Sequence, residues 1–357
     1  MILKQVATQI MRLFLALALG NIIGLATFAF FAIVSYALKV WELEIPTEFV
    51  SFSEVNYSLT LGAFMLVGSL IAGFIYSRLE GPRSHGPADL MVCIKKDELP
   101  DIKAGFITSF LTMVSVSSGS SVGMFGPIIH YGGCIAASLE RFFKVLTRGV
   151  VLAAGGAAGI AALFSAPIAA SIFAHEMLLR RFRSTESLPV IMAALGGYFS
   201  AVMLLGDNRR FLSVIGDPPP LEPFSLGMAI LVGIFSGLLS SLYVYLVGAG
   251  PGWVKKTNIP PFFRPLIAAT ILFVISPFFP QLIGPGMPAV NMALAGEFTL
   301  YLLIALAFLK VLATAFCRSF GFHGGILLPA CFFGAMMGSA FDLIVGNGGH
   351  LYAILGA

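Results

Sequence analysis

Charged residues are scarce in this sequence. Asp, Glu, Lys and Arg together make up 11% of it, whereas a soluble domain usually carries about 25%. Hydrophobic residues make up 58%, and the mean hydropathy is +0.95. These values indicate a polytopic membrane protein. The net charge of +4 is small and no clustered basic patch is present, so we expect no nucleic-acid partner.

Cysteine is also rare, and it lacks the spacing of a metal site. The four cysteines lie in apolar context without a CxxC pair, so we expect buried thiols and neither a metal centre nor a disulfide framework. They are Cys93, Cys134, Cys317 and Cys331. The sequence also shows no nucleophile–base pair and no phosphate-binding loop. We therefore expect no enzyme activity, no catalytic residue and no organic cofactor.

Long charge-free runs predict the membrane helices, because about 20 apolar residues suffice to cross a bilayer. The first run, residues 13–38, is too long for the apolar core of a cleavable signal peptide and predicts a membrane helix. Lys4 and Arg12 precede it and place the N-terminal segment in the cytoplasm. Further spans are expected at about residues 59–77, 187–205, 223–249, 263–279 and 298–316.

One charge-free run, residues 104–139, is interrupted in its middle by the serines and glycines of the stretch from Ser115 to Gly133. Non-helical backbone at membrane depth is tolerated only where it is buried in protein or lines a cavity. The sequence Gly123-Met-Phe-Gly-Pro127 then opens the next helix and leaves backbone N–H groups free to attract an anion. We therefore predict an anion site inside a membrane protein.

The second half of the chain repeats this pattern. Arg318-Ser-Phe-Gly-Phe-His-Gly-Gly-Ile-Leu-Leu-Pro329 approaches an apolar helix, and its proline lies 202 residues after Pro127. Two broken segments at matching places are typical of an inverted-repeat transporter or channel. The predicted domains are a first membrane repeat over residues 1–206, an extracytoplasmic linker over 207–222 and a second membrane repeat over 223–357.

A third interrupted run covers residues 149–174. We expect Gly155-Gly-Ala-Ala-Gly159 and Ser165-Ala-Pro167 to divide it into two shorter helices. The run ends at His175-Glu176 and is followed by the basic cluster Arg180, Arg181 and Arg183, which we place in the cytoplasm.

In their order, these motifs resemble those of the CLC chloride channels and chloride/proton antiporters over nearly the whole chain. Arg83-Ser-His-Gly-Pro87 stands in place of the family's Gly-Ser-Gly-Ile-Pro segment. Gly123-Met-Phe-Gly-Pro127 matches Gly-Arg-Glu-Gly-Pro, and Gly325-Ile-Leu-Leu-Pro329 matches Gly-x-Phe-x-Pro. The stretch from Gly155 to Met177 is similar to the family's alanine-rich helix pair that ends in Glu-Met. Each motif alone is weak, but four in order are specific.

The resemblance implies an all-α, multi-pass protein of the cell membrane, in bacteria the inner membrane, with inverted repeats of broken and tilted helices. It also implies a homodimer in which each subunit conducts chloride or a similar small anion, so a bound chloride ion is expected. By position, Ser84 is the hydroxyl ligand. The further anion-binding residues implied by the resemblance are His85, Gly86, Phe125, Gly126, Ile326 and Leu327.

Phe125 falls where the family has its gating glutamate, the group that occludes the pore and carries the proton. Phenylalanine cannot titrate, so proton-coupled exchange by the family mechanism is not expected and passive conduction is favoured. Phe125 is instead a candidate hydrophobic gate.

Glu176 matches the internal proton-transfer glutamate of the antiporters. Its alternative interpretation is a helix-end carboxylate paired with Arg180 or a neighbouring arginine. A proton-coupled transporter would need another acid such as Glu176 or Asp89. A non-conducting homologue plugged by Phe125 and a fluoride exporter are further alternatives, although fluoride-handling relatives tend to replace the serine found here at Ser84.

The sequence ends at Leu351-Tyr-Ala-Ile-Leu-Gly-Ala357, where the third-last or fourth-last helix of the family would begin. The remaining part would carry the pore tyrosine and part of the dimer interface. Either the sequence is truncated or the protein lacks half of its second repeat. We expect truncation, because the second repeat would otherwise leave a large face of the pore open to lipid.

Replacing Ser84 with alanine tests the hydroxyl ligand. Serine is also a common helix N-cap, and the two roles are compatible. Ser84→Ala removes one donor to the anion, so we expect altered anion selectivity or affinity in a liposome flux assay. Unchanged selectivity would remove Ser84 from the set of ligands.

Overall fold

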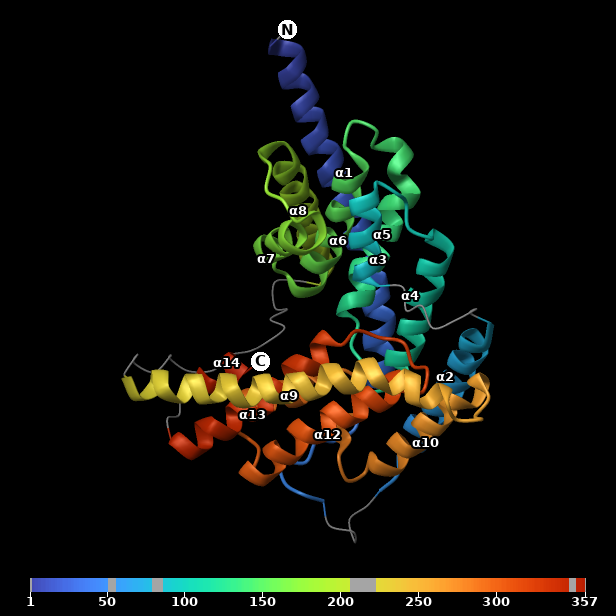
Figure 1. Ribbon diagram of the computed structural model, residues 1–357, viewed down its shortest axis with the longest axis vertical. Helices are drawn as coiled ribbons and strands as arrows, with labels where there is room; N and C mark the ends of the chain where they lie inside the picture. The colour runs from blue at the N-terminus through green and yellow to red at the C-terminus, as the bar shows by residue number, and fades with distance from the viewer. Residues whose placement is uncertain (1, 51–55, 79–85, 206–222, 347–350, 357) are drawn as a thin grey trace. The chain divides into compact units, whose positions relative to one another are not determined.

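A computed structural model describes residues 2–50, 56–78, 86–205, 223–346 and 351–356 (Figure 1). Within these ranges the chain forms fourteen α-helices joined by loops and short 3₁₀ or π-helical turns, and no β-strand. The predicted all-α fold is confirmed. Six of these helices are long and apolar enough to cross a bilayer. They are α1 (Ile2–Val40), α2 (Leu59–Arg78), α8 (Ser184–Leu205), α9 (Pro223–Lys255), α12 (Leu300–Ser319) and α13 (Leu327–Val345).

The predicted spans agree with the observed helices to within a few residues, with three exceptions. The span predicted at about residues 263–279 forms only the 12-residue helix Arg264–Ile275, which is shorter than the roughly 20 residues of a membrane crossing. Helix α1 begins at Ile2, about ten residues earlier than predicted, because no glycine or proline interrupts the segment before residue 13. Helix α9 continues past residue 249 and through Pro251 to Lys255.

The chain divides into two compact units. Unit 1 consists of Met1–Val34, Arg83–Met113 and Phe125–Arg210. Unit 2 consists of Ser35–Pro82, Val114–Met124 and Phe211–Ala357. The predicted linker at 207–222 lies outside the described residues, and the repeat boundaries beside it stay a prediction.

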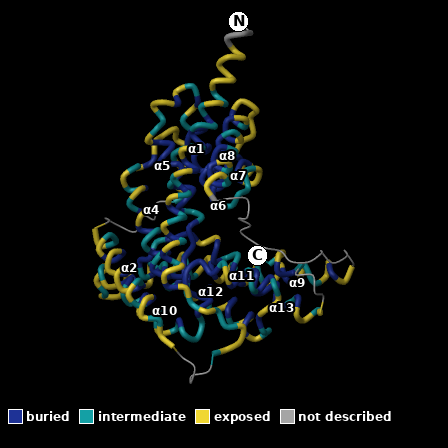
Figure 2. The backbone as a smooth tube through the Cα atoms, turned by 180° about the vertical axis from the view of Figure 1, so that it is seen from behind, coloured by how far each residue is buried: buried dark blue, intermediate teal, exposed yellow. Residues whose placement is uncertain are grey.

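Helix α6 (Arg148–Phe164) is the centre of unit 1, and every residue from Gly149 to Leu163 is buried (Figure 2). Its alanines and glycines let neighbouring backbones approach closely, as is typical of helix packing in lipid. A Cβ atom at Gly155 would lie 2.5 Å from the carbonyl oxygen of Gly132 on α5 (Phe125–Leu139). A Cβ atom at Gly197 of α8 would overlap the carbonyl oxygen of Ala158.

One sequence prediction is wrong here. Gly155-Gly-Ala-Ala-Gly159 does not interrupt a helix, since it lies inside α6. These glycines allow neighbouring helices to pack closely against α6, and they do not form a turn. The break occurs only at Ser165, which has a φ of +54°, and α7 (Pro167–Phe173) then begins with a proline that is tolerated in a first helical turn.

Unit 1 also contains three short elements: α3 (Pro87–Lys96), the part of α4 (Ile102–Ser117) up to Met113, and a π-helical turn, Ala174–Leu179. The π-helical turn extends α7, and such turns are frequent at functional sites.

In unit 2, helices α9, α12 and α13 pack against one another (Figure 1). Helix α10 (Arg264–Ile275) packs on α2, and α11 (Met287–Leu294) packs on α13. Asp342 near the end of α13 accepts hydrogen bonds from the N–H groups of Tyr352 and Ala353, at 3.2 and 2.9 Å. This carboxylate caps the start of α14 (Leu351–Gly356), where a negative charge is favoured.

The close approach of α6 and α8 can be tested with a single methyl group. Gly197→Ala places a Cβ atom against the backbone of Ala158, and overpacking of this kind costs about 1–3 kcal/mol. We expect a lower unfolding temperature for the detergent-purified protein. Gly233→Ala on α9 is the matched control, because nothing lies within 4 Å of its Cβ position. Equal unfolding temperatures for the two variants would contradict the tight packing.

Candidate functional site

Two glycine-rich loops in unit 2 follow the ends of α4 and α12. Each loop begins with a glycine in the left-handed region, Gly119 with a φ of +84° and Gly321 with a φ of +95°. Side chains with a Cβ atom rarely adopt this conformation, so each turn requires glycine. The two glycines lie 202 positions apart, which is the offset that the sequence predicted between the two repeats.

The loops are joined by a reciprocal pair of hydrogen bonds. The N–H of Gly123 donates to the carbonyl of Gly325 at 2.8 Å, and the N–H of Gly325 donates to the carbonyl of Gly123 at 2.6 Å. This antiparallel bridge again joins residues 202 positions apart. Equivalent atoms exchange roles across it, which is the geometry that an inverted repeat produces at its two-fold axis. Helices α5 and α13 each begin two residues after a bridging glycine.

Serine hydroxyls hold the first loop against its surroundings in unit 2. Ser120 donates to the carbonyl of Ser115 at 2.6 Å, and Ser115 Oγ accepts the N–H of His323 at 3.1 Å. The hydroxyls of Ser121 and Thr314 on α12 lie 3.5 Å apart. These serines are buried, so their polar groups stabilise the non-helical backbone at this depth.

Two side chains hold carbonyl groups of the second loop. Arg318 Nη1 donates to the carbonyl of Gly324 at 2.8 Å, and the hydroxyl of Tyr243 on α9 donates to the carbonyl of Ile326 at 3.0 Å. The first N–H groups of a helix have no intrahelical acceptor, so the start of α13 offers donors to a ligand. Ile326 and Leu327 remain 41% and 43% exposed there.

Phe125 and Gly126 lie in the first turn of α5, in unit 1. The Phe125 ring packs edge-on against Phe164 and Phe173, with centroid distances of 5.1 and 5.8 Å. Sequence reasoning missed these two partners, although both flank the Ser165-Ala-Pro167 break. Movement of Phe125 as a gate would have to disrupt both ring contacts.

Ser84 and His85 lie outside the described residues. Gly86 is the N-cap of α3, and its N–H donates to Asp89 Oδ2 at 3.1 Å. Asp89 therefore lies in the first helical turn, as predicted. Its carboxylate accepts the hydrogen bond of the Gly86 N–H group, which the family resemblance assigned to the anion. An anion that used the Gly86 N–H would have to displace this carboxylate.

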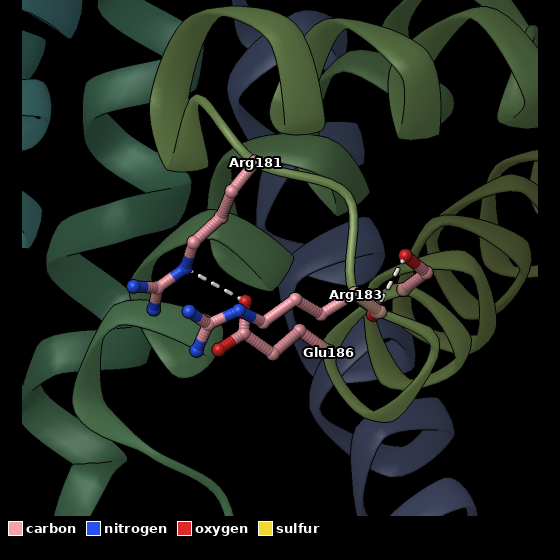
Figure 3. Close-up of polar contacts among 4 residues, drawn as sticks. Arg181, Arg183 and Glu186 are labelled. Atoms are coloured by element: carbon pink, nitrogen blue, oxygen red, sulfur yellow. Dashed lines mark hydrogen bonds and ion pairs between the residues drawn. The ribbon is translucent and has the colours of Figure 1, made fainter.

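Glu176 lies in the π-helical turn of unit 1 and is exposed. The predicted pairing with a neighbouring arginine is not observed. Arg181 instead bonds Glu186 through Nε and Oε2 at 2.8 Å (Figure 3), and Ser187 donates to the Arg183 carbonyl at 2.9 Å. Within the described part of the chain, Glu176 forms no ion pair. Glu186 opens α8, so its charge also suits the helix dipole.

Comparisons with known proteins agree with this architecture. The sequence matches the voltage-gated chloride channel family over residues 68–357. It is 26% identical over 306 residues to an uncharacterized protein, MJ0305, of Methanocaldococcus jannaschii, covering 85% of this chain and 76% of that protein. It is 25% identical over 284 residues to the voltage-gated ClC-type chloride channel ClcB of Salmonella typhimurium, covering 78% of this chain and 68% of ClcB.

Two solved structures share the fold. A CLC-type fluoride/proton antiporter superposes with a TM-score of 0.78 at 20% identity, covering 99% of this chain and 85% of the other. A slow cyanobacterial Cl⁻/H⁺ antiporter superposes with a TM-score of 0.79 at 20% identity, covering 97% and 83%.

The paired loops can be tested at Gly324. A Cβ atom there would contact Val122 and would lie 2.8 Å from the carbonyl oxygen of Gly123, so alanine would force the two loops apart. We expect Gly324→Ala to reduce anion flux in liposomes by about tenfold or more, because the loss of a bridge of this kind costs at least about 1 kcal/mol and shifts the following helix. Gly252→Ala has nothing within 4 Å of its Cβ position and is the control. Wild-type flux in Gly324→Ala would exclude the loops from the pathway.

Proposed function

Because the chain belongs to the voltage-gated chloride channel family, whose members carry anions across membranes, we propose that it conducts chloride passively, without proton exchange. The chain is a multi-pass membrane protein. Chloride is proposed to bind where the first turns of the broken helices present their N–H groups. Partial positive charges at helix starts replace the hydration of a halide without trapping it, as a directly contacting cation would.

The observation that carries this proposal is Phe125 at the first residue of α5. The resemblance to CLC proteins assigns proton transfer to a glutamate at this position. A phenyl ring binds no proton, and here it packs on Phe164 and Phe173. Proton coupling by that route is therefore absent from the proposed mechanism.

The further parts of the pathway follow from the same resemblance. Ser84 supplies a hydroxyl, and the backbone around Phe125, Gly126, Ile326 and Leu327 supplies N–H donors. Two copies of the chain form a homodimer with one pathway in each. Ser84 favours chloride over fluoride as the conducted anion.

A coupled exchanger is the second candidate, and two observations favour it. The two solved structures above are named as proton antiporters. Glu176 is exposed and forms no ion pair within the described residues. A transporter of this kind would move protons through Glu176 by a route that bypasses Phe125.

Liposome flux separates the two candidates. With purified protein under a chloride gradient, we expect chloride efflux that generates a voltage, together with no proton uptake. Glu176→Gln removes the titratable group without changing the side-chain size, and we expect chloride efflux within about twofold of wild type, since a surface substitution of this kind usually changes free energies by no more than about 0.5 kcal/mol.

Each other outcome has a distinct meaning. Proton uptake in fixed ratio to chloride, abolished in Glu176→Gln, would establish the exchanger and overturn passive conduction. Absence of flux in folded wild-type protein, with flux in Phe125→Ala, would identify a homologue plugged by the ring.

A further inference from the structure

Lys310 is an ionisable side chain at the middle of a membrane span. It occupies the centre of the 20-residue helix α12 and is fully buried, with 0% of its surface exposed. Lysine is costly at such a depth, and ionisable groups there usually serve the path of an ion or substrate.

The ammonium group is surrounded by dipoles and an aromatic ring. Lys310 Nζ donates to the carbonyl of Leu282 at 3.1 Å and to that of Gly284 at 2.8 Å. It also lies 4.7 Å from the centre of the Phe332 ring on α13, a cation–π distance. Among the described residues no carboxylate pairs with Lys310. The two carbonyl oxygens and the ring face are groups that can solvate an ammonium ion, and none of them carries a negative charge that would cancel it.

Lys310 is linked to the first glycine loop through one residue. The carbonyl of Gly284 accepts from Lys310, and the N–H of Gly284 donates to the carbonyl of Gly119 at 2.9 Å. One helical turn after Lys310, Thr314 meets Ser121 of the same loop. Lys310 is therefore separated from the loop that leads into α5 by one residue, Gly284.

Helix α12 carries a second cation, beside the other loop. Arg318, two turns after Lys310, holds the carbonyl of Gly324 beside the bridging Gly325. Arg318 thus contacts the second loop directly, whereas Lys310 is linked to the first loop through Gly284. In both cases the cation contacts carbonyl oxygens of the protein backbone.

We propose that Lys310 is an electrostatic positioning residue of the anion site, whose uncancelled positive charge, one residue from the first loop, attracts chloride into the pathway. The inference rests on the proposed function, since it needs an anion at these loops. Because Gly284 lies between the charge and the loop, the charge raises the potential without forming a contact that would hold the ion. Two unit charges about 10 Å apart in an effective dielectric constant of about 20 change a binding constant roughly tenfold.

The experiment compares chloride binding by calorimetry with chloride flux in liposomes, using the full chain. Lys310→Met removes the charge and keeps the length of the side chain, and we expect about tenfold weaker chloride binding. Lys310→Arg keeps the charge and should bind within about twofold of wild type. Lys255→Met, at the exposed end of α9, controls for the loss of one charge elsewhere.

If Lys310→Met does not fold, Lys310→Gln takes its place, because its neutral amide group can still donate hydrogen bonds to the backbone carbonyls that Lys310 contacts. Weaker binding in whichever neutralised variant folds, with normal binding in Lys310→Arg, supports the inference. Wild-type affinity in that variant overturns it. Failure of both neutralised variants to fold, alongside a folded Lys310→Arg, also overturns it, because the charge would then serve folding alone. Absence of chloride binding and flux in the wild type would instead reject the proposed function.

Discussion

The two hydrogen bonds between Gly123 and Gly325 constrain the surroundings of the candidate site. They join two loops whose turns require glycine at Gly119 and Gly321, and they leave no space for a side chain at Gly324. A helix begins two residues after each of these bridging glycines. A non-helical backbone at this depth needs an internal partner for every polar group. The buried serines, Arg318 and Tyr243 supply those partners, so these polar residues have a common structural purpose.

In unit 1, small side chains stabilise the association of helices in lipid. Helices in lipid gain little from burying apolar surface against one another, so close van der Waals packing carries their association. Gly155 and Gly197 allow α6 to contact α5 and α8 through their backbones. Together with Phe164 and Phe173, this packing holds the start of α5, where Phe125 replaces a titratable side chain.

Glycine illustrates both the success and the failure of sequence reasoning. The glycine-rich stretches around Gly123 and Gly325 were predicted to break the helices, and they do. The similar stretch Gly155-Gly-Ala-Ala-Gly159 was predicted to do the same, and it lies inside α6. Glycine permits a turn and also permits close helix contact, and only neighbouring helices decide between these uses. Glu176 gives a second example, because Arg181 pairs with Glu186, five positions later, and not with Glu176.

The sequence by itself determined the membrane class, the places of the broken helices, the offset of 202 positions between the two halves and the absence of a titratable group at Phe125. These properties follow from local composition and from the chemistry of single side chains. Only the tertiary structure decided which groups satisfy the buried polar atoms: Lys310 with the carbonyls of Leu282 and Gly284, and the two bridging glycines with each other. Hydrogen bonds reach only about 3 Å, so partners far apart in sequence become known only when folding brings them together.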